Sequence, residues 1–198
     1  DLTVTIQNGA PACRVNGELL LRNQDLLIME SPDKYLFLFP SYPGIEEASV
    51  SKDATESCFY CTPPFDREFR ENLFHAIRNV FLYLAWTRNM LMIHSASILY
   101  RDQVWLFSGH SGMGKSTHTG LWLERFPDAY ILNDDKPALR FMGDRLMAFG
   151  TPWSGKHDYS TPAVVPLGGI CFLERSDENR ICPADGKRAV FNIFSQTY

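Results

Sequence analysis

The residues best suited to chemistry lie in the glycine-rich segment 109–116. It reads Gly109-His110-Ser111-Gly112-Met113-Gly114-Lys115-Ser116 and fits the pattern G-x-x-x-x-G-K-[ST] at every fixed position. Glycines allow successive backbone N–H groups to point into one concavity that holds phosphate oxygens. Lys115 would supply a positive charge to the β- and γ-phosphates, and Ser116 a hydroxyl to Mg²⁺, with Thr117 as substitute or support. Residues 109–117 are therefore predicted to bind a nucleotide.

The segments on either side of this loop have the character that a phosphate loop requires. An apolar strand is expected at Gln103–Ser108, and a helix from Lys115 to Phe126, where Pro127 ends it. A helix that begins at the loop adds positive potential at its N-terminus. The motif predicts nucleotide binding, but by itself it does not separate a kinase from an ATPase or a GTPase.

Two adjacent acids follow the next expected strand, Ala129–Leu132. Asp134 lies 19 positions after Lys115, which leaves room for one helix and one returning strand. An acid at a strand end beside a phosphate loop is the usual second contact to Mg²⁺. The side chains of Asp134 and Asp135 should diverge, so that one faces the metal and the other the acceptor hydroxyl. The alternative is a solvated turn, because Asp-Asp-Lys-Pro is good turn chemistry.

A histidine interrupts the expected apolar strand Met90–Tyr100. On pattern alone, a lone histidine such as His94 most often has a structural role. Together with the other motifs, it carries a resemblance. The segments His94–Leu99, Val104–Ser116 and Ile131–Asp135, in this order, resemble the catalytic core of the HPr serine kinase/phosphorylase family. That family belongs with the phosphoenolpyruvate carboxykinases in one phosphate-loop superfamily, and the match covers about residues 90–175.

The resemblance implies an ATP-dependent phosphotransferase with ATP and Mg²⁺ as cofactors. Its acceptor would be a hydroxyl, in the first place that of Ser, on a small protein, a peptide or a metabolite. By the same resemblance His94 lies near the γ-phosphate, and Asp134 is the general base that takes the hydroxyl proton. Asp135 then holds Mg²⁺ with Ser116, unless the two acids exchange roles. His94, Lys115 and Asp134 are thus the predicted catalytic residues.

Differences from the family keep a second hypothesis open. Thr117 and His118 follow the Gly-Lys-Ser triplet, where HPr kinases typically have Glu. The alternative is a nucleotide-binding regulatory protein without phosphoryl transfer. Lys136 and Arg140 offer further charges near the expected site, unless Lys136 is a solvated turn residue. The loop Thr151–His157 either contacts the acceptor or nucleotide, or is only anchored by Trp153.

The elements that must position these residues alternate between strands and helices. Hairpin turns are expected at Arg101-Asp102 and at Gly143-Asp144. A helix is expected from Arg67 to about Trp86. Residues 1–62 read as β-rich, with strand candidates at Leu2–Ile6, Leu26–Met29, Tyr35–Phe39 and Ser57–Thr62. The predicted fold class is α/β: a mixed, partly antiparallel sheet with a phosphate loop, like the phosphoenolpyruvate carboxykinase core, plus a β-rich N-terminal module. Pro63-Pro64 divides residues 1–64, an accessory module, from residues 65–198, the kinase-like core.

Composition limits the compartment and the partners. The net charge is −4, whereas dedicated nucleic-acid binders are more often basic. No apolar run approaches the ~20 residues of a membrane span. The five cysteines form an odd, sparse set, so we expect free thiols, a cytoplasmic protein, and a structural role for Cys58-x-x-Cys61. Assembly as a homo-oligomer is left open. The helix signal Ala189–Phe194 stands close to Tyr198, so further helices that shape the acceptor site are expected beyond this residue.

Overall fold

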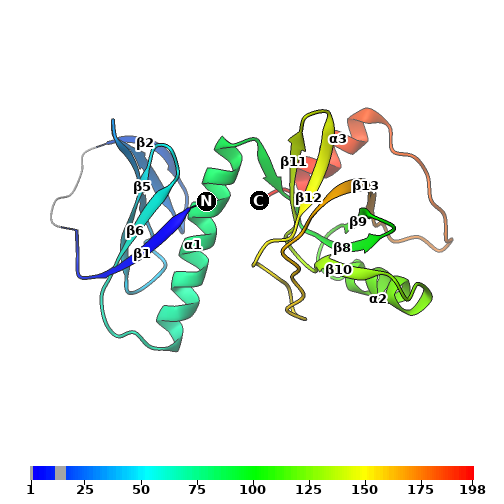
Figure 1. Cartoon of the computed structure of the whole chain (residues 1–198), viewed down its shortest axis with the longest axis horizontal. Helices are drawn as coiled ribbons and strands as arrows, with labels where there is room; N and C mark the ends of the chain where they lie inside the picture. The colour runs from blue at the N-terminus through cyan, green and yellow to red at the C-terminus, as the bar shows by residue number, and fades with distance from the viewer. Residues whose placement is uncertain (1, 12–16) are drawn as a thin grey trace. The chain divides into compact units, whose positions relative to one another are not determined.

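The computed structural model describes residues 2–11 and 17–198, and the chain forms two compact units, Asp1–Leu84 and Ala85–Tyr198 (Figure 1). Within the described residues the fold is mixed α/β, with two mixed sheets and three helices. The predicted α/β class is thereby confirmed, as are the mixed, partly antiparallel sheet and the β-rich N-terminal part.

The first unit contains a six-stranded sheet. Its strands are β1 (Thr3–Asn8), β2 (Glu18–Arg22), β3 (Leu27–Glu30), β4 (Lys34–Leu38), β5 (Ile45–Ser51) and β6 (Glu56–Cys61). They lie in the order β1-β6-β5-β4-β3-β2; β1 runs parallel to β6, and the other neighbouring pairs are antiparallel. The sequence indicated strands at β1, β3, β4 and β6, but it did not predict β2 or β5.

Helix α1 (Arg67–Thr87) begins where the sequence predicted. The Asp66 carboxylate accepts a hydrogen bond of 2.9 Å from the Phe69 backbone N–H and so caps the helix. Apolar residues of α1 share one core with inward residues of the sheet: Phe69, Ala76, Val80 and Leu84 with Phe37, Phe39 and Phe59. Most of α1 therefore packs as part of the first unit, whereas the sequence-based division after residue 64 grouped it with the kinase-like core.

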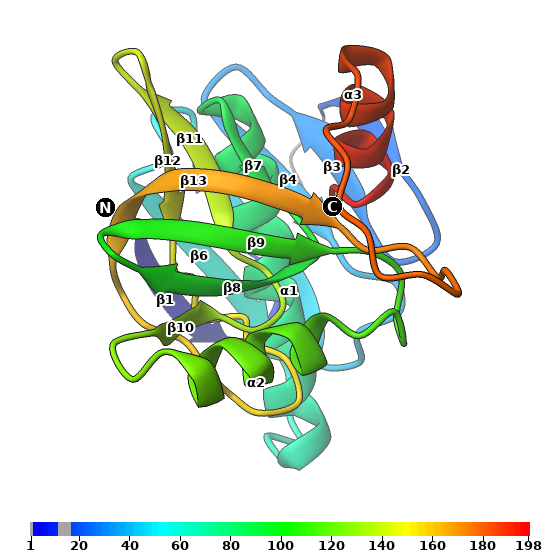
Figure 2. The same ribbon diagram turned by 90° about the vertical axis from the view of Figure 1, so that its right-hand side faces the viewer.

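The second unit contains a seven-stranded sheet (Figure 2). Its strands are β7 (Met90–Met92), β8 (Ser95–Tyr100), β9 (Gln103–Ser108), β10 (Tyr130–Asn133), β11 (Ala138–Met142), β12 (Arg145–Phe149) and β13 (Val164–Phe172). They lie in the order β10-β8-β9-β13-β12-β11-β7. Strands β9 and β13 are parallel and every other neighbouring pair is antiparallel, so the sheet is mixed.

Both predicted hairpins are present. Strands β8 and β9 are joined by Arg101 and Asp102, whose φ angles of 50° and 60° are those of the tight turn that suits twisted strands. Strands β11 and β12 are joined through Gly143, with φ of 63°. The β8–β9 hairpin places β9 inside the sheet, between β8 and β13, and the glycine-rich segment follows at the end of this strand.

The prediction of one strand from Met90 to Tyr100 is wrong. The structure has two strands, β7 and β8, separated by Ile93 and His94. Strand β7 pairs with β11, whereas β8 pairs with β9 and β10, so the chain changes partners at His94. Because both pieces are apolar, the local pattern does not reveal this change. His94 therefore lies at a junction between strands, not within one.

Two helices belong to the second unit. Helix α2 (Lys115–Arg125) packs against β8 and β9 (Figure 2). Trp122, and Phe126 directly after the helix, share an apolar cluster with Ile98 and Phe107. Helix α3 (Gly186–Ser195) ends at Ser195, and residues 196–198 continue as an extended segment beside the β7–β8 junction. The helix signal at Ala189–Phe194 is therefore part of a helix that ends before Tyr198.

The cysteines support a structural reading of Cys58-x-x-Cys61. The four described cysteines, Cys58, Cys61, Cys171 and Cys182, are free, and Cys13 lies outside the described residues. Cys58 and Cys61 are three positions apart on β6, so they face opposite sides of the sheet and do not form a chelating pair. Burial raises the pKa of the Cys61 thiol to about 11. None of the described helices has the length and apolar character needed to cross a membrane.

Candidate functional site

The predicted phosphate-loop residues form the connection between β9 and α2. Gly109, Gly112 and Gly114 have φ angles of 153°, 81° and 93°, in the left-handed region that glycine adopts without strain. A Cβ on Gly109 would lie 3.3 Å from the carbonyl oxygen of Leu173, directly after β13. Gly114 is the N-cap of α2, and no side chain among the described residues caps this end. The loop therefore presents backbone N–H groups at an uncapped helix N-terminus.

Lys115 is folded back over this loop. Its Nζ donates hydrogen bonds to the carbonyl oxygens of Gly109 at 2.8 Å and of His110 at 3.4 Å. Burial lowers the pKa of Lys115, and the nearby Asp135 carboxylate partly opposes this effect. Ser116 and Thr117 are exposed on the first turn of α2, and His110 and Ser111 are exposed in the loop. The loop thus combines exposed hydroxyls with a partly desolvated ammonium that an anion would stabilise.

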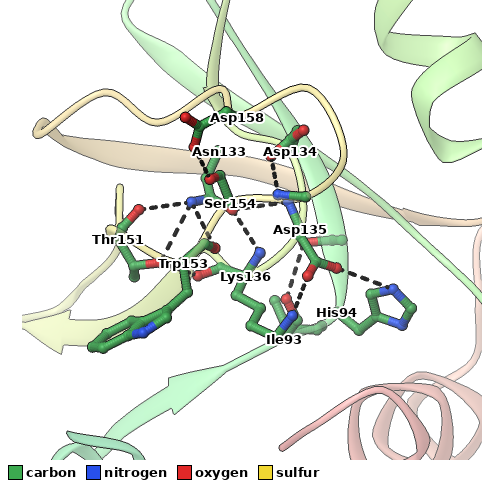
Figure 3. Close-up of polar contacts among 12 residues, drawn as sticks. Ile93, His94, Asn133, Asp134, Asp135, Lys136, Thr151, Trp153, Ser154 and Asp158 are labelled. Atoms are coloured by element: carbon green, nitrogen blue, oxygen red, sulfur yellow. Dashed lines mark hydrogen bonds and ion pairs between the residues drawn. The ribbon is translucent and has the colours of Figure 1, made fainter. Parts of the chain in front are cut away.

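His94 and Asp135 lie together beside this loop. His94 Nε2 is 3.3 Å from Asp135 Oδ1, and the Lys136 ammonium contacts Asp135 Oδ2 (Figure 3). Burial alone would raise the pKa of Asp135, but the hydrogen bonds from His94 and Lys136 outweigh it and lower the pKa. The Asp135 carboxylate is therefore held as an anion between two nitrogen donors.

The neighbouring acid has different partners. Asp134 is only 9% exposed, and its carboxylate accepts hydrogen bonds from the backbone N–H groups of Gly155 and His157. Figure 3 shows that the two acids point in different directions. Asp134 thus orders the turn at Gly155–Asp158, and it is Asp135, not Asp134, that meets His94. The predicted base and the predicted histidine are not brought together.

Asn133 is the main residue that sequence reasoning missed. Its side chain is fully buried, and its Oδ1 accepts from the backbone N–H groups of Asp135 at 2.9 Å and of Lys136 at 2.5 Å. Its Nδ2 donates to the carbonyl oxygens of Thr151 at 2.9 Å and Trp153 at 3.3 Å. Asn133 therefore joins the Asp135–Lys136 turn to the loop at Thr151–Trp153. The only signal was its position at a strand end, where asparagine often bonds the backbone two residues ahead.

Two buried serines, Ser97 on β8 and Ser108 on β9, hydrogen-bond to the backbone of the residues that form the site. The Ser97 hydroxyl donates to the Asn133 carbonyl at 2.6 Å and accepts from the Asn133 N–H at 2.9 Å. The Ser108 hydroxyl donates to the His94 carbonyl at 2.8 Å. These buried serines replace missing ladder hydrogen bonds where the strands end or change partner. They fix the backbone positions of His94 and Asn133 relative to β8 and β9.

The extended segment after α3 lies against His94. The His94 N–H donates to the Gln196 carbonyl at 2.7 Å, and the Tyr198 N–H donates to the Met92 carbonyl at 3.2 Å. The Tyr198 ring lies 5.9 Å from the His94 ring and 4.8 Å from Lys136 Nζ. A cavity of about 270 Å³ lies here; its lining residues are His94, His110, Ser111, Ser195, Gln196, Thr197 and Tyr198. His94 and the tip of the glycine loop thus face one cavity.

The remaining predicted contacts are placed as follows. Trp153 is 5% exposed and its carbonyl accepts from Asn133, so it anchors the loop Thr151–His157. Arg140 is exposed on β11. No group of three or more histidine, cysteine or acidic side chains among the described residues could hold a metal ion. Asp135 and Ser116, the predicted metal ligands, would therefore need oxygen atoms from water or from a bound ligand to complete a coordination shell.

Comparison with known proteins adds no family assignment. A scan against models of known protein families finds no match, and a search of curated proteins finds no relative with significant similarity. The resemblance to the HPr serine kinase family therefore stays a prediction that is carried by the motifs alone.

Proposed function

We propose that this chain is an ATP-dependent phosphotransferase, similar to HPr serine kinases, that transfers the γ-phosphoryl group to a hydroxyl. The acceptor is a serine of a small protein or peptide, or the hydroxyl of a metabolite. One observation carries the proposal: the loop that holds Lys115 and the His94–Asp135 pair adjoin. His94 lines a cavity together with His110 and Ser111, and the Asp135 charge acts on Lys115. Phosphoryl transfer needs mainly such positioning and charge neutralisation.

In this proposal the glycine loop binds the nucleotide phosphates. The uncapped N–H groups at Gly114 and the first turn of α2 would contact phosphate oxygens, and the Lys115 ammonium would leave the Gly109 carbonyl to pair with them. The donors that would hold Mg²⁺ are the Ser116 hydroxyl and the Asp135 carboxylate, both oxygen atoms of the type that this ion prefers. When bound, Mg²⁺ neutralises phosphate charge.

The acids take different roles from those that the resemblance implies. Because Asp135 Oδ1 faces His94 Nε2, this nitrogen is the natural site of the imidazole proton in the neutral form. Nδ1 is then the nitrogen that can accept the proton of an acceptor hydroxyl, and Asp135 positions the ring, as acids do for histidine bases elsewhere. We assign Asp134, whose carboxylate accepts two backbone N–H groups, to the loop at Gly155–Asp158.

The direct test is label transfer from γ-labelled ATP to proteins of a lysate or to a serine peptide library. We expect Lys115→Met to weaken ATP binding at least tenfold, and His94→Gln to leave binding unchanged while it lowers transfer about 10²-fold. Lys187→Met, at an exposed position in α3, is the matched control for Lys115→Met. Asp144→Asn, at an exposed position in the β11–β12 turn, is the matched control for the Asp135→Asn variant used below. If the protein binds Mg-ATP but labels nothing, while a known kinase labels the same material, the proposal fails.

A second candidate is a nucleotide-binding regulator without transfer activity. One observation favours it: both oxygens of the Asp135 carboxylate already have side-chain partners, His94 and Lys136. A regulator would bind nucleotide tightly and show a turnover that Asp135→Asn does not change. Substantial turnover that this substitution abolishes would exclude the regulator.

A further inference from the structure

Lys136 occupies an unusual place for a lysine. Its ammonium contacts Oδ2 of the adjacent Asp135 and lies 4.8 Å from the centre of the Tyr198 ring, a cation–π distance. The Lys136 side chain is only 12% exposed, and that of Asp135 19%. Lysine normally keeps its ammonium in water because the ion is strongly hydrated. Here a strand-end lysine is turned inward onto the carboxylate predicted to bind the metal.

The backbone of Lys136 is fixed, so the ammonium can leave only by side-chain rotation. Its N–H donates to Asn133 Oδ1 at 2.5 Å, and its carbonyl accepts from the Thr151 hydroxyl at 2.7 Å. Four rotatable bonds separate this anchored backbone from the ammonium. The charge can therefore move away from Asp135 while the turn that carries both residues stays in place.

We propose that Lys136 is an internal substitute for the metal ion at Asp135. Its ammonium contacts Oδ2, an oxygen that would otherwise be open to a Mg²⁺ ion brought by nucleotide phosphates, and the Tyr198 ring packs against the ammonium. His94 occupies the other oxygen, so the carboxylate does not collect a free divalent cation. The inference rests on the proposed function only for the statement that nucleotide carries the metal to the site.

Electrostatics supports this order of events. A unit positive charge in contact with the carboxylate repels a divalent ion and so offsets most of the attraction that the carboxylate exerts on it. A nucleotide changes the balance, because its phosphates bring several negative charges that attract the metal and offer the displaced ammonium a new partner. Removal of the lysine charge should therefore reveal metal binding that the wild-type protein lacks without nucleotide.

The test is Mn²⁺ binding to the nucleotide-free full chain, measured by loss of the free-ion signal in electron paramagnetic resonance. We expect Lys136→Met to bind Mn²⁺ at least tenfold more tightly than wild type, and Lys136→Arg to stay within threefold of it. The gain should vanish in Asp135→Asn combined with Lys136→Met. Lys187→Met, at an exposed position of α3, is the charge-matched control. Lys136→Gln is a second neutral variant in case the first does not fold.

The outcomes separate this inference from the proposed function. A gain below threefold in both neutral variants, or a gain that survives Asp135→Asn, overturns the substitution of lysine for metal. If wild type neither binds Mg-ATP nor labels an acceptor, yet Lys136→Met gains Asp135-dependent Mn²⁺ binding, the proposed function fails and the inference stands. Tyr198→Ala should shift Mn²⁺ affinity in the same direction as Lys136→Met by a smaller factor.

Discussion

Replacement of Asn133 by alanine gives the sharpest test of the site's architecture. The fully buried amide serves two backbone N–H donors, of Asp135 and Lys136, and two carbonyl acceptors, of Thr151 and Trp153. The alanine side chain would offer these four backbone groups no hydrogen-bond partner. An unsatisfied buried group costs about 1–3 kcal/mol, and water entering the space recovers part of this. We expect Asn133→Ala to lower the free energy of unfolding by roughly 3–5 kcal/mol, at the upper end for single substitutions.

The assay can isolate the unit that contains the site. All four tryptophans, Trp86, Trp105, Trp122 and Trp153, lie in the unit Ala85–Tyr198, so intrinsic fluorescence during urea unfolding reports on this unit. Asn179→Ala, at an exposed position, is the matched control and should change the free energy of unfolding by less than about 0.5 kcal/mol. If Asn133→Ala also costs less than about 1 kcal/mol, the network around Asn133 does not hold the turn, and the reasoning is refuted.

Three further predictions concern charge and reactivity. The pKa of Asp135 is lowered in the folded protein, so its ion pairs stabilise the fold fully above the ordinary carboxyl pKa of about 3.9. This stabilisation is lost as the pH falls through the lower folded pKa. The difference in unfolding free energy between wild type and Asp135→Asn should therefore shrink between about pH 5 and pH 2. For the ATP binding proposed above, the lowered pKa of Lys115 predicts that affinity declines with rising pH before ordinary lysines titrate near about 10.4. Calorimetry of the wild type against Lys115→Arg can follow this decline. The Cys61 thiol is fully buried and has a pKa of about 11, so it should react with iodoacetamide at pH 8 at least 100-fold more slowly than the exposed Cys182. Mass spectrometry of labelled peptides measures both rates, and equal rates would contradict the burial of Cys61.

The parts of the fold that local chemistry determines were predicted well. Residues close in sequence determine three of these features: strand β9, the hairpin turn at Arg101–Asp102 and the start of α1 after Asp66. Strands β2 and β5 were missed for a physical reason. Every residue of β2 is exposed, so it lacks the alternation that marks a half-buried strand, and adjacent glutamates interrupt the pattern of β5.

The site was predicted in composition but not in arrangement. The glycine loop, His94, Asp134 and Asp135 were all identified as candidates, because their residue types and order are unusual. What decides that Asp135 pairs with His94, while Asp134 serves the loop at Gly155–Asp158, is the buried amide of Asn133 and its partners at Thr151–Trp153. These contacts join residues about twenty positions apart, and no local pattern encodes them. The change of strand partner at His94 escaped prediction for the same reason.

The parallel pairing of β9 with β13 has a consequence for when the glycine-rich loop can take its final shape during synthesis. Ser108 pairs with Phe172, 64 residues later, and the Leu173 N–H donates to the Ser108 carbonyl at 2.8 Å, directly beside Gly109. The ribosome therefore completes β8, β9, the glycine loop and α2 well before the strand that supports the loop's first residue emerges. Long-range parallel pairs form late and slowly. A nascent chain that stops short of Leu173 would carry the whole glycine-rich motif without the neighbour that shapes it. The nucleotide binding proposed above should therefore appear only once β13 is in place.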